Sequence, residues 1–167
     1  KVQPTAIWDY LDSDDGFQNS GIAGCEVYRS DDGGQTWKKT HDKPNPNFNT
    51  YGYYFAKIYT SHTNPDKIFS MGFIAQVSTD GGKTFKNLGQ MHADIHDITF
   101  DINNSDRMYV GTDGGVYRSW DGGTTMEMIE NLPVCQFYQV STDNEEPYNV
   151  YGGLHDNGSW YGPSSSP

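Results

Sequence analysis

The residues best suited to chemistry lie in the segment 91–97, which reads Met-His-Ala-Asp-Ile-His-Asp. Side chains of an extended chain alternate between two sides, so His92, Asp94 and His96 would share one side. Two imidazoles and a carboxylate could bind a divalent transition metal, act as general acid–base groups or hydrogen-bond sugar hydroxyls. A hydrogen-bonded polar layer without any ligand would account for the same pattern.

Apolar residues take the even positions directly after this run, at Ile98, Phe100 and Ile102. The change of parity predicts a bulge or the start of a strand near Asp97, because the side chains must change face there. The His-x-Asp-x-His run would then be the loop that leads into this strand.

Two later segments could bring polar groups to the same place: Thr-Asp-Gly-Gly at 112–115 and Leu-His-Asp-Asn-Gly at 154–158. Their small residues let the backbone approach a ligand closely, although ordinary turn chemistry explains them equally well. The metal ligands would be His92, Asp94 and His96. The full predicted ligand-binding set is His92, Asp94, His96, Asp113, His155, Asp156 and Asn157.

A repeated pattern indicates the elements that must position these residues. It reads Ser-Asp-Asp-Gly-Gly-Gln-Thr-Trp at 30–37, Ser-Thr-Asp-Gly-Gly-Lys-Thr-Phe at 78–85 and Ser-Trp-Asp-Gly-Gly-Thr-Thr-Met at 119–126. Asp-Gly-Gly between two alternating runs predicts a β-hairpin, because glycine accepts positive φ without steric cost. The positions predicted to be purely architectural are Ser30, Asp32, Gly34, Thr36, Trp37, Ser78, Asp80, Gly82, Thr84, Phe85, Ser119, Asp121, Gly123 and Thr125, with Trp37, Phe85 and Met126 pointing inward as apolar plugs.

Reading outward from these turns gives units of four strands and about 40 residues, which fits a β-propeller. The fold class is therefore all-β, with three to four blades of four antiparallel strands. The incomplete first blade would span 1–50, the second 51–90, the third 91–131 and the start of a fourth 132–167. The broken frame at both ends predicts part of a larger propeller, and an independent four-bladed ring is the alternative.

The direction of the strands assigns the turns to two faces. Connections between strands 1 and 2 and between strands 3 and 4 of a blade share one face with the three repeated turns. Connections between strands 2 and 3 and between blades lie on the other face. The predicted ligand-binding residues all fall on this second face, where we expect the site.

Composition limits the partners. The chain has 167 residues and a net charge of −11, which argues against nucleic acid and anionic membrane surfaces. It has no apolar stretch long enough to insert into a membrane. Cys25 and Cys135 match no metal or redox spacing; we expect two buried free thiols, with a disulfide as the alternative.

Aromatic residues could line a carbohydrate groove or pack between blades. Those expected near the site face are Tyr51, Tyr53, Tyr54, Phe55 and Phe73. A sugar offers apolar C–H faces and a polar rim, so aromatic rings beside carboxylates suit it. A second group, consisting of Phe137, Tyr138 and Tyr151, is predicted to lie in the core.

At the three repeated turns the chain resembles the Asp-box family, also called BNR repeats, found in sialidases, sortilin-type receptors and xyloglucan-cleaving glycoside hydrolases. The resemblance implies that each Asp box is a folding element at the turn between the outer two strands of a propeller blade. Met126 departs from the family pattern, which usually has Trp or Phe there, and this implies a weaker plug.

The stretch 92–163 is similar to a group of large bacterial Asp-box proteins described as glycosyl-hydrolase-like or sortilin-like. The shared motifs are His-x-Asp-x-His at 92–96, Asp-Gly-Gly-Val-Tyr at 113–117, Leu-Pro-x-x-Gln-Phe-Tyr at 132–138 and Gly-Gly-x-x-Asp-Asn-Gly-Ser-Trp at 152–160. The resemblance implies a secreted, periplasmic or cell-surface protein. It does not give an activity, because fold does not determine function.

Two functions follow as hypotheses. The first is a binding module that recognises a glycan, a peptide or a partner subunit, together with the remaining blades of the same protein or assembly. The second is part of a glycoside hydrolase that uses paired carboxylates, with Asp94, Asp97, Asp113 and Asp156 as catalytic candidates. Sialidase activity is rejected, since an arginine triad with a tyrosine nucleophile cannot be assembled from Arg29, Arg107 and Arg118.

Overall fold

β-Strands joined by turns make up the fold in the computed structural model, which describes residues 25–43, 45, 47 and 56–165. Every strand pairs antiparallel with its neighbours. The described part contains a two-stranded sheet (β1–β2), two four-stranded sheets (β3–β6 and β7–β10) and a three-stranded sheet (β11–β13). The strands are β1 (Tyr28–Arg29), β2 (Lys38–Lys39), β3 (Lys57–Thr60), β4 (Ile68–Met71), β5 (Ala75–Ser78), β6 (Lys86–Asn87), β7 (Ile95–Asp101), β8 (Asn104–Thr112), β9 (Gly115–Ser119), β10 (Glu127–Met128), β11 (Phe137–Thr142), β12 (Asn149–Leu154) and β13 (Ser159–Pro163).

The two four-stranded sheets run in simple up-and-down order, β3-β4-β5-β6 and β7-β8-β9-β10. This is the topology of propeller blades, and the predicted all-β class with four-stranded antiparallel blades is confirmed. The aromatic residues predicted at 51–55 lie outside the described residues.

The three repeated turns at 30–37, 78–85 and 119–126, for which we keep the label Asp boxes, share one hydrogen-bonded geometry. In the second box the Ser78 hydroxyl donates to Asp80 at 2.8 Å and accepts from the Gly82 N–H at 2.8 Å. The Thr84 N–H and hydroxyl both donate to the Asp80 carboxylate, at 2.9 and 2.6 Å. The equivalent four bonds are made in the first and third boxes. The Ser, Asp and Thr of the repeat therefore hold one turn geometry three times.

Consecutive units dock through the second glycine of each box. Thr40, three residues after the first box, donates its hydroxyl to the Gly82 carbonyl at 2.8 Å. Leu88, three residues after the second box, packs against Gly123. A Cβ added to Gly123 would lie only 2.4 Å from Cδ2 of Leu88. The Gly89 N–H donates to the Gly123 carbonyl at 2.8 Å. The first three units are thus related by one repeated packing step.

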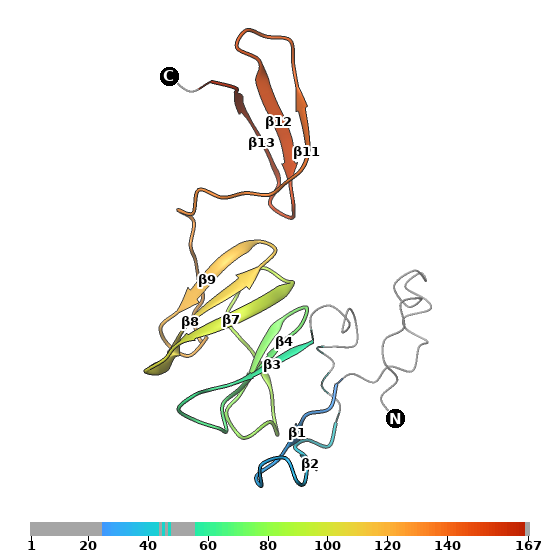
Figure 1. Cartoon of the computed structure of the whole chain (residues 1–167), viewed down its shortest axis with the longest axis vertical. Helices are drawn as coiled ribbons and strands as arrows, with labels where there is room; N and C mark the ends of the chain where they lie inside the picture. Colours follow the sequence, from blue (N-terminus) through green and yellow to red (C-terminus); the bar gives the residue numbers. More distant parts are fainter. Residues whose placement is uncertain (1–24, 44, 46, 48–55, 166–167) are drawn as a thin grey trace, which may run out of the picture.

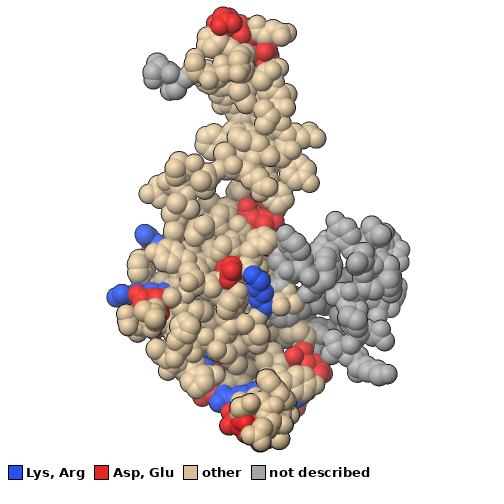
Figure 2. Space-filling model, in the orientation of Figure 1, with Lys and Arg blue, Asp and Glu red and all other residues tan. Residues whose placement is uncertain are grey.

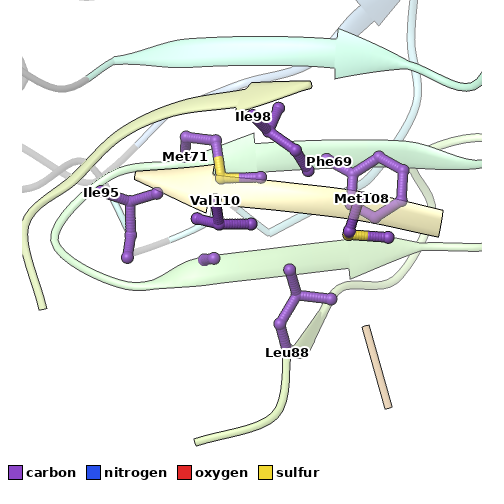
Figure 3. Packing of buried hydrophobic residues seen from close by; sticks show 8 residues of the cluster. Phe69, Met71, Leu88, Ile95, Ile98, Met108 and Val110 are labelled. Carbon is purple, nitrogen blue, oxygen red and sulfur yellow. The ribbon is translucent and has the colours of Figure 1, made fainter. Parts of the chain in front are cut away.

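The hydrophobic core lies between the β3–β6 and β7–β10 sheets (Figure 3). Strand β4 is buried along its whole length, whereas β7 and β8 show partial alternation of buried and exposed positions. The core consists of Phe69, Met71, Ala75, Leu88, Ile95, Ile98, Met108 and Val110.

The β11–β13 sheet stands apart from the other sheets and is reached through the segment 130–136 (Figure 1). Its strands pair only with one another. Phe137, Tyr138 and Tyr151 are exposed, so their predicted place in the core is wrong. The physical reason is that no described element packs over either face of this three-stranded sheet.

Two further sequence predictions are corrected. Trp37 is 62% exposed and its indole N–H donates to the Gly34 carbonyl at 3.1 Å, so it is not an inward plug; Phe85 and Met126 are half-buried. The cysteines are free as predicted, but they are not buried: Cys25 is half-buried and Cys135 is exposed. Burial raises the pKa of the Cys25 thiol to about 11. Within the described ranges, no helix has the length and apolar character needed to cross a membrane.

Candidate functional site

The entry to β7 presents the first candidate residues. The ladder between β7 and β8 shifts register between Ile95 and Asp97, which confirms the irregularity predicted there. Asp94, just before the strand, has a φ of 60°, a region that non-glycine residues rarely occupy and that costs about 1–3 kcal/mol. Its N–H donates to the Phe73 carbonyl in the β4–β5 loop at 3.0 Å. The turn at Asp94 is therefore fixed by the neighbouring blade.

Asp113, in the turn between β8 and β9, is the centre of the cluster. One carboxylate oxygen shares a hydrogen bond with His96 Nε2, and the other lies 3.9 Å from His155 Nδ1. Its N–H donates to the Asp94 carbonyl at 3.3 Å. The Asp113 side chain is only 18% exposed, so it is an acceptor shielded from much of the solvent.

The turn between β12 and β13 supplies the opposite side of the site. Asn157 Nδ2 donates to the Asp113 carbonyl at 3.1 Å and to the His155 carbonyl at 3.1 Å. Asp156 has a φ of 56°. The His155 N–H donates to the Gln136 carbonyl at 2.9 Å. Two sheets that share no strand pairing therefore meet at side chains that the sequence predicted as a group.

We call Asp94, His96, Asp113, His155, Asp156 and Asn157 the junction site. Its electrostatics are dominated by carboxylates. Burial raises the pKa of Asp94, and the negative charges of Asp113 and Asp156 raise it further. On the face shown in Figure 2, acidic atoms lie where the upper sheet meets the rest of the molecule. The site thus holds mutually repelling carboxylates beside imidazoles.

His92 lies at the edge of this site. The backbone N–H of His92 donates to the Tyr117 hydroxyl oxygen at 3.1 Å, and the ring Nδ1 lies 3.0 Å from the Ala93 carbonyl. The ring covers Gly114 so closely that a Cβ there would lie 2.3 Å from it. Gly114 is therefore needed to make room for this imidazole.

Asp97 does not join the other candidates. Its carboxylate accepts from the Tyr59 hydroxyl and pairs with Lys57 at 3.7 Å. The Tyr59 hydrogen bond is the largest cause that lowers the pKa of Asp97. The Asp97 side chain thus lies against the β3 strand, and it does not share a site with the other catalytic candidates.

The group whose metal-ligating atoms come together also differs from the predicted one. Among the described residues, the ligand atoms of Asp113, His155 and Asp156 all lie within 4.8 Å of one another. The predicted set of His92, Asp94 and His96 assumed an extended chain, whereas the left-handed backbone at Asp94 interrupts the alternation.

One aromatic ring stacks on a junction-site residue, and the backbone of a second aromatic residue contacts another. Tyr138 stacks on His155, with ring centroids 5.5 Å apart and an interplanar angle of 10°. Phe73, predicted on this face, is exposed and adjoins Asp94 through its carbonyl. Sequence reasoning missed Tyr138 because a register shift lies between Phe137 and Gln139, and strand alternation gives no sign of it.

Comparison with known proteins gives a fold-level likeness. No family model matches the chain, and no curated protein matches it. Similar solved structures include an ancestral GH74 enzyme, 12% identical with a TM-score of 0.45 over 60% of this chain. A GH74 enzyme of Niastella koreensis is 16% identical, with a TM-score of 0.48 over 83% of this chain. The chain spans 13% and 24% of the lengths of these two proteins.

Proposed function

We propose that this chain is a recognition segment that binds a glycan through the junction site. The observation that carries the proposal is the meeting at Asp113 of loops from two separate sheets. Carboxylate, amide and imidazole groups converge there, and the Tyr138 ring stacks on His155. Such a mixture offers hydrogen-bonding partners for hydroxyls and flat apolar surfaces for sugar rings.

The charge of the site narrows the ligand class. Three carboxylates face the site in a chain with a net charge of −11. An acidic sugar would add like charge at close range, which disfavours binding. The proposed ligand is therefore a neutral or amino-sugar glycan, recognised outside the cell or at its surface by a protein whose remaining blades complete the propeller.

Binding to immobilised neutral polysaccharides tests this function, with polygalacturonate as the acidic comparison. Replacing Tyr138 with alanine removes the ring stacked on His155 and should weaken binding by roughly 5- to 150-fold, since truncating an aromatic contact residue costs on the order of 1–3 kcal/mol. Tyr148→Ala is the matched control, because Tyr148 is another exposed tyrosine, directly before β12, and should bind as the wild type does.

Two results would contradict the glycan proposal. One is the absence of binding to every member of the neutral and amino-sugar panel. The other is equal loss in the Tyr138 and Tyr148 variants. Capture of a peptide or protein that is lost with Tyr138→Ala would replace the glycan by a protein partner at the same site.

The glycoside-hydrolase alternative is favoured by one observation, the raised pKa of Asp94 beside Asp113 and Asp156. Glycoside hydrolysis needs one carboxyl group that keeps its proton and a second that is ionised. Asp94 has the environment of the acid, and Asp113 and Asp156 are the carboxylates whose charges act on it. Loss of polysaccharide turnover in Asp94→Asn with binding retained would support an enzyme, and no turnover by the wild type would exclude it for the panel tested.

A further inference from the structure

We propose that Asp113, His155 and Asp156 form a binding site for one divalent transition-metal ion. The site would link the β8–β9 turn to the β12–β13 turn. It goes beyond glycan recognition, because an ion can bind here whether or not a sugar does. The inference rests on the spacing of the ligand atoms, the charge around them and the groups that orient them.

The spacing leaves room for an ion. His155 Nδ1 and an Asp113 carboxylate oxygen are 3.9 Å apart, which is too far for a hydrogen bond. Metal–ligand bonds of about 2.0–2.2 Å place neighbouring ligand atoms roughly 3–3.5 Å apart. The three ligand atoms already lie within 4.8 Å of one another. Small rotations of both the His155 and the exposed Asp156 side chains would bring them to coordination distance.

The negative charge around the site favours the binding of a cation. The ligand set brings the carboxylates of Asp113 and Asp156 within 4.8 Å of one another, and the charges of both act on the carboxyl group of Asp94. In the part of the chain that the structure describes, the ion pairs made by Lys and Arg go to other acids. Among the described residues, the ion-pair partners of Asp113 are His96 and His155. A bound dication would relieve the repulsion among the three carboxylates.

Groups outside the ligand set hold it in position. His96 hydrogen-bonds the Asp113 oxygen that faces away from His155, and Tyr138 stacks on the His155 ring. Hydrogen-bonded carboxylates and oriented imidazoles are typical of the surroundings of metal ligands. One imidazole with two carboxylates suits zinc or manganese better than calcium or magnesium, which prefer all-oxygen sites.

Such an ion would connect the β7–β10 sheet to the β11–β13 sheet. The β11–β13 sheet pairs with no strand of the β7–β10 sheet, and the hydrogen bond from Asn157 to the Asp113 carbonyl spans the junction. Ligands from both sides would add a bond that depends on metal. The orientation of the two turns would then be more fixed with the ion than without it.

Calorimetric titration of the chelator-treated chain with zinc, manganese and calcium chlorides tests the proposal. The wild type should bind one zinc or manganese ion. His155→Gln and Asp156→Asn should each weaken this binding at least about tenfold, because each removes one ligand. The matched controls are His62→Gln and Asp42→Asn, which change the same residue types at exposed positions away from the junction and should bind as the wild type does.

Thermal unfolding supplies a second readout. Zinc or manganese should raise the midpoint of the wild type and of both controls, but not that of the His155 and Asp156 variants. The proposal fails if the wild type binds neither ion, if both site variants bind as tightly as the controls, or if calcium binds in preference. Loss of binding in His92→Gln with retention in His155→Gln would move the ion to the His92, Asp94 and His96 set and also overturn it.

Discussion

Single residues do their structural work here through short networks of hydrogen bonds. The aspartate of each Asp box accepts from a serine hydroxyl and from both the backbone and the hydroxyl of a threonine. Such bonds favour the ionised carboxylate, and they lower the pKa of Asp32 and of Asp121 to about 2. The aspartates therefore stabilise the fold, because their carboxylate oxygens accept hydrogen bonds within the turn.

Acid should weaken the fold through these carboxylates. The pKa of Asp121 falls from an ordinary 3.8 to about 2, chiefly through the Thr125 N–H. A lowered carboxyl pKa contributes stability that is complete above the unfolded pKa and is lost as pH falls through the folded pKa. The unfolding midpoint of the wild type should thus drop between about pH 4 and pH 2. Asp121→Asn should be less stable at pH 7 and lose less over that window.

Asp42→Asn is the control for this pH profile, since Asp42 is an exposed aspartate outside the boxes. Its midpoint should follow the wild-type curve. A profile for Asp121→Asn that is as steep as the wild type between pH 4 and pH 2 would show that the box carboxylate does not contribute as proposed.

The junction site shows a different use of residues. Asp94 and Asp156 are the described non-glycine residues with positive φ, and both lie at this site. Backbone strain of this kind is found at functional positions more often than elsewhere. Burial and neighbouring carboxylates raise the pKa of Asp94, whereas hydrogen bonds from Thr125 lower that of Asp121, so the same residue type has opposite electrostatic environments at the two places.

Elements are joined in this molecule by a repeated contact between blades. The residue three positions after one box packs on the second glycine of the next box, as Thr40 does on Gly82 and Leu88 on Gly123. This glycine is needed for its positive φ and also for the space above it. The repeat therefore encodes both a turn and the docking surface for the preceding unit.

Replacing Gly123 with alanine should separate these two requirements. Gly123 and Gly34 occupy the same box position, with φ values of 90° and 91°, so both substitutions introduce similar backbone strain. A Cβ on Gly123 would lie 2.4 Å from Leu88, whereas on Gly34 its nearest neighbour is Trp37 at 3.9 Å. We expect Gly123→Ala to cost about 1–3 kcal/mol more in urea unfolding than Gly34→Ala. Equal costs would argue against a docking role.

The whole molecule divides into a well-packed part and a more open part. Blades β3–β6 and β7–β10 share the core, whereas β11 is exposed along its whole length. Figure 1 shows the β11–β13 sheet extending away from the other sheets. The Asn157 side chain joins the two parts by its hydrogen bond to the Asp113 carbonyl, so a ligand at the junction site would affect both.

Hydrogen exchange should reveal this division. Amides of β4 lie in a fully buried strand and should exchange at least about tenfold more slowly than those of β11–β13, because local opening needs less energy where little apolar surface is buried. Mass spectrometry of peptides from 68–71 and 137–142 measures this difference. Equal protection in the two strands would show that the chain opens as one cooperative unit.

Much of the fold was accessible from local patterns. The Asp-Gly-Gly turns and the alternating runs beside them predicted the strands of the second and third units, and the parity change after His96 predicted the irregularity found before Asp97. The exposure of Trp37 and Tyr138 was not predictable in this way. Burial depends on which elements cover a strand, and an aromatic residue in a strand looks the same whether it is covered or not.

By itself the sequence determined the repeat, the turn chemistry and the strand order, because hydrogen bonds within a box and alternation within a strand are local. It also placed the polar loops on one face through the direction of the strands. Only the tertiary structure decided that Asp113 lies between His96 and His155, that Asp97 turns away toward Tyr59, and that the candidate metal ligands come from two sheets. These outcomes depend on the docking of one unit against another and on the left-handed turn at Asp94. This turn interrupts the alternation of side chains that the prediction from His92 to His96 assumed.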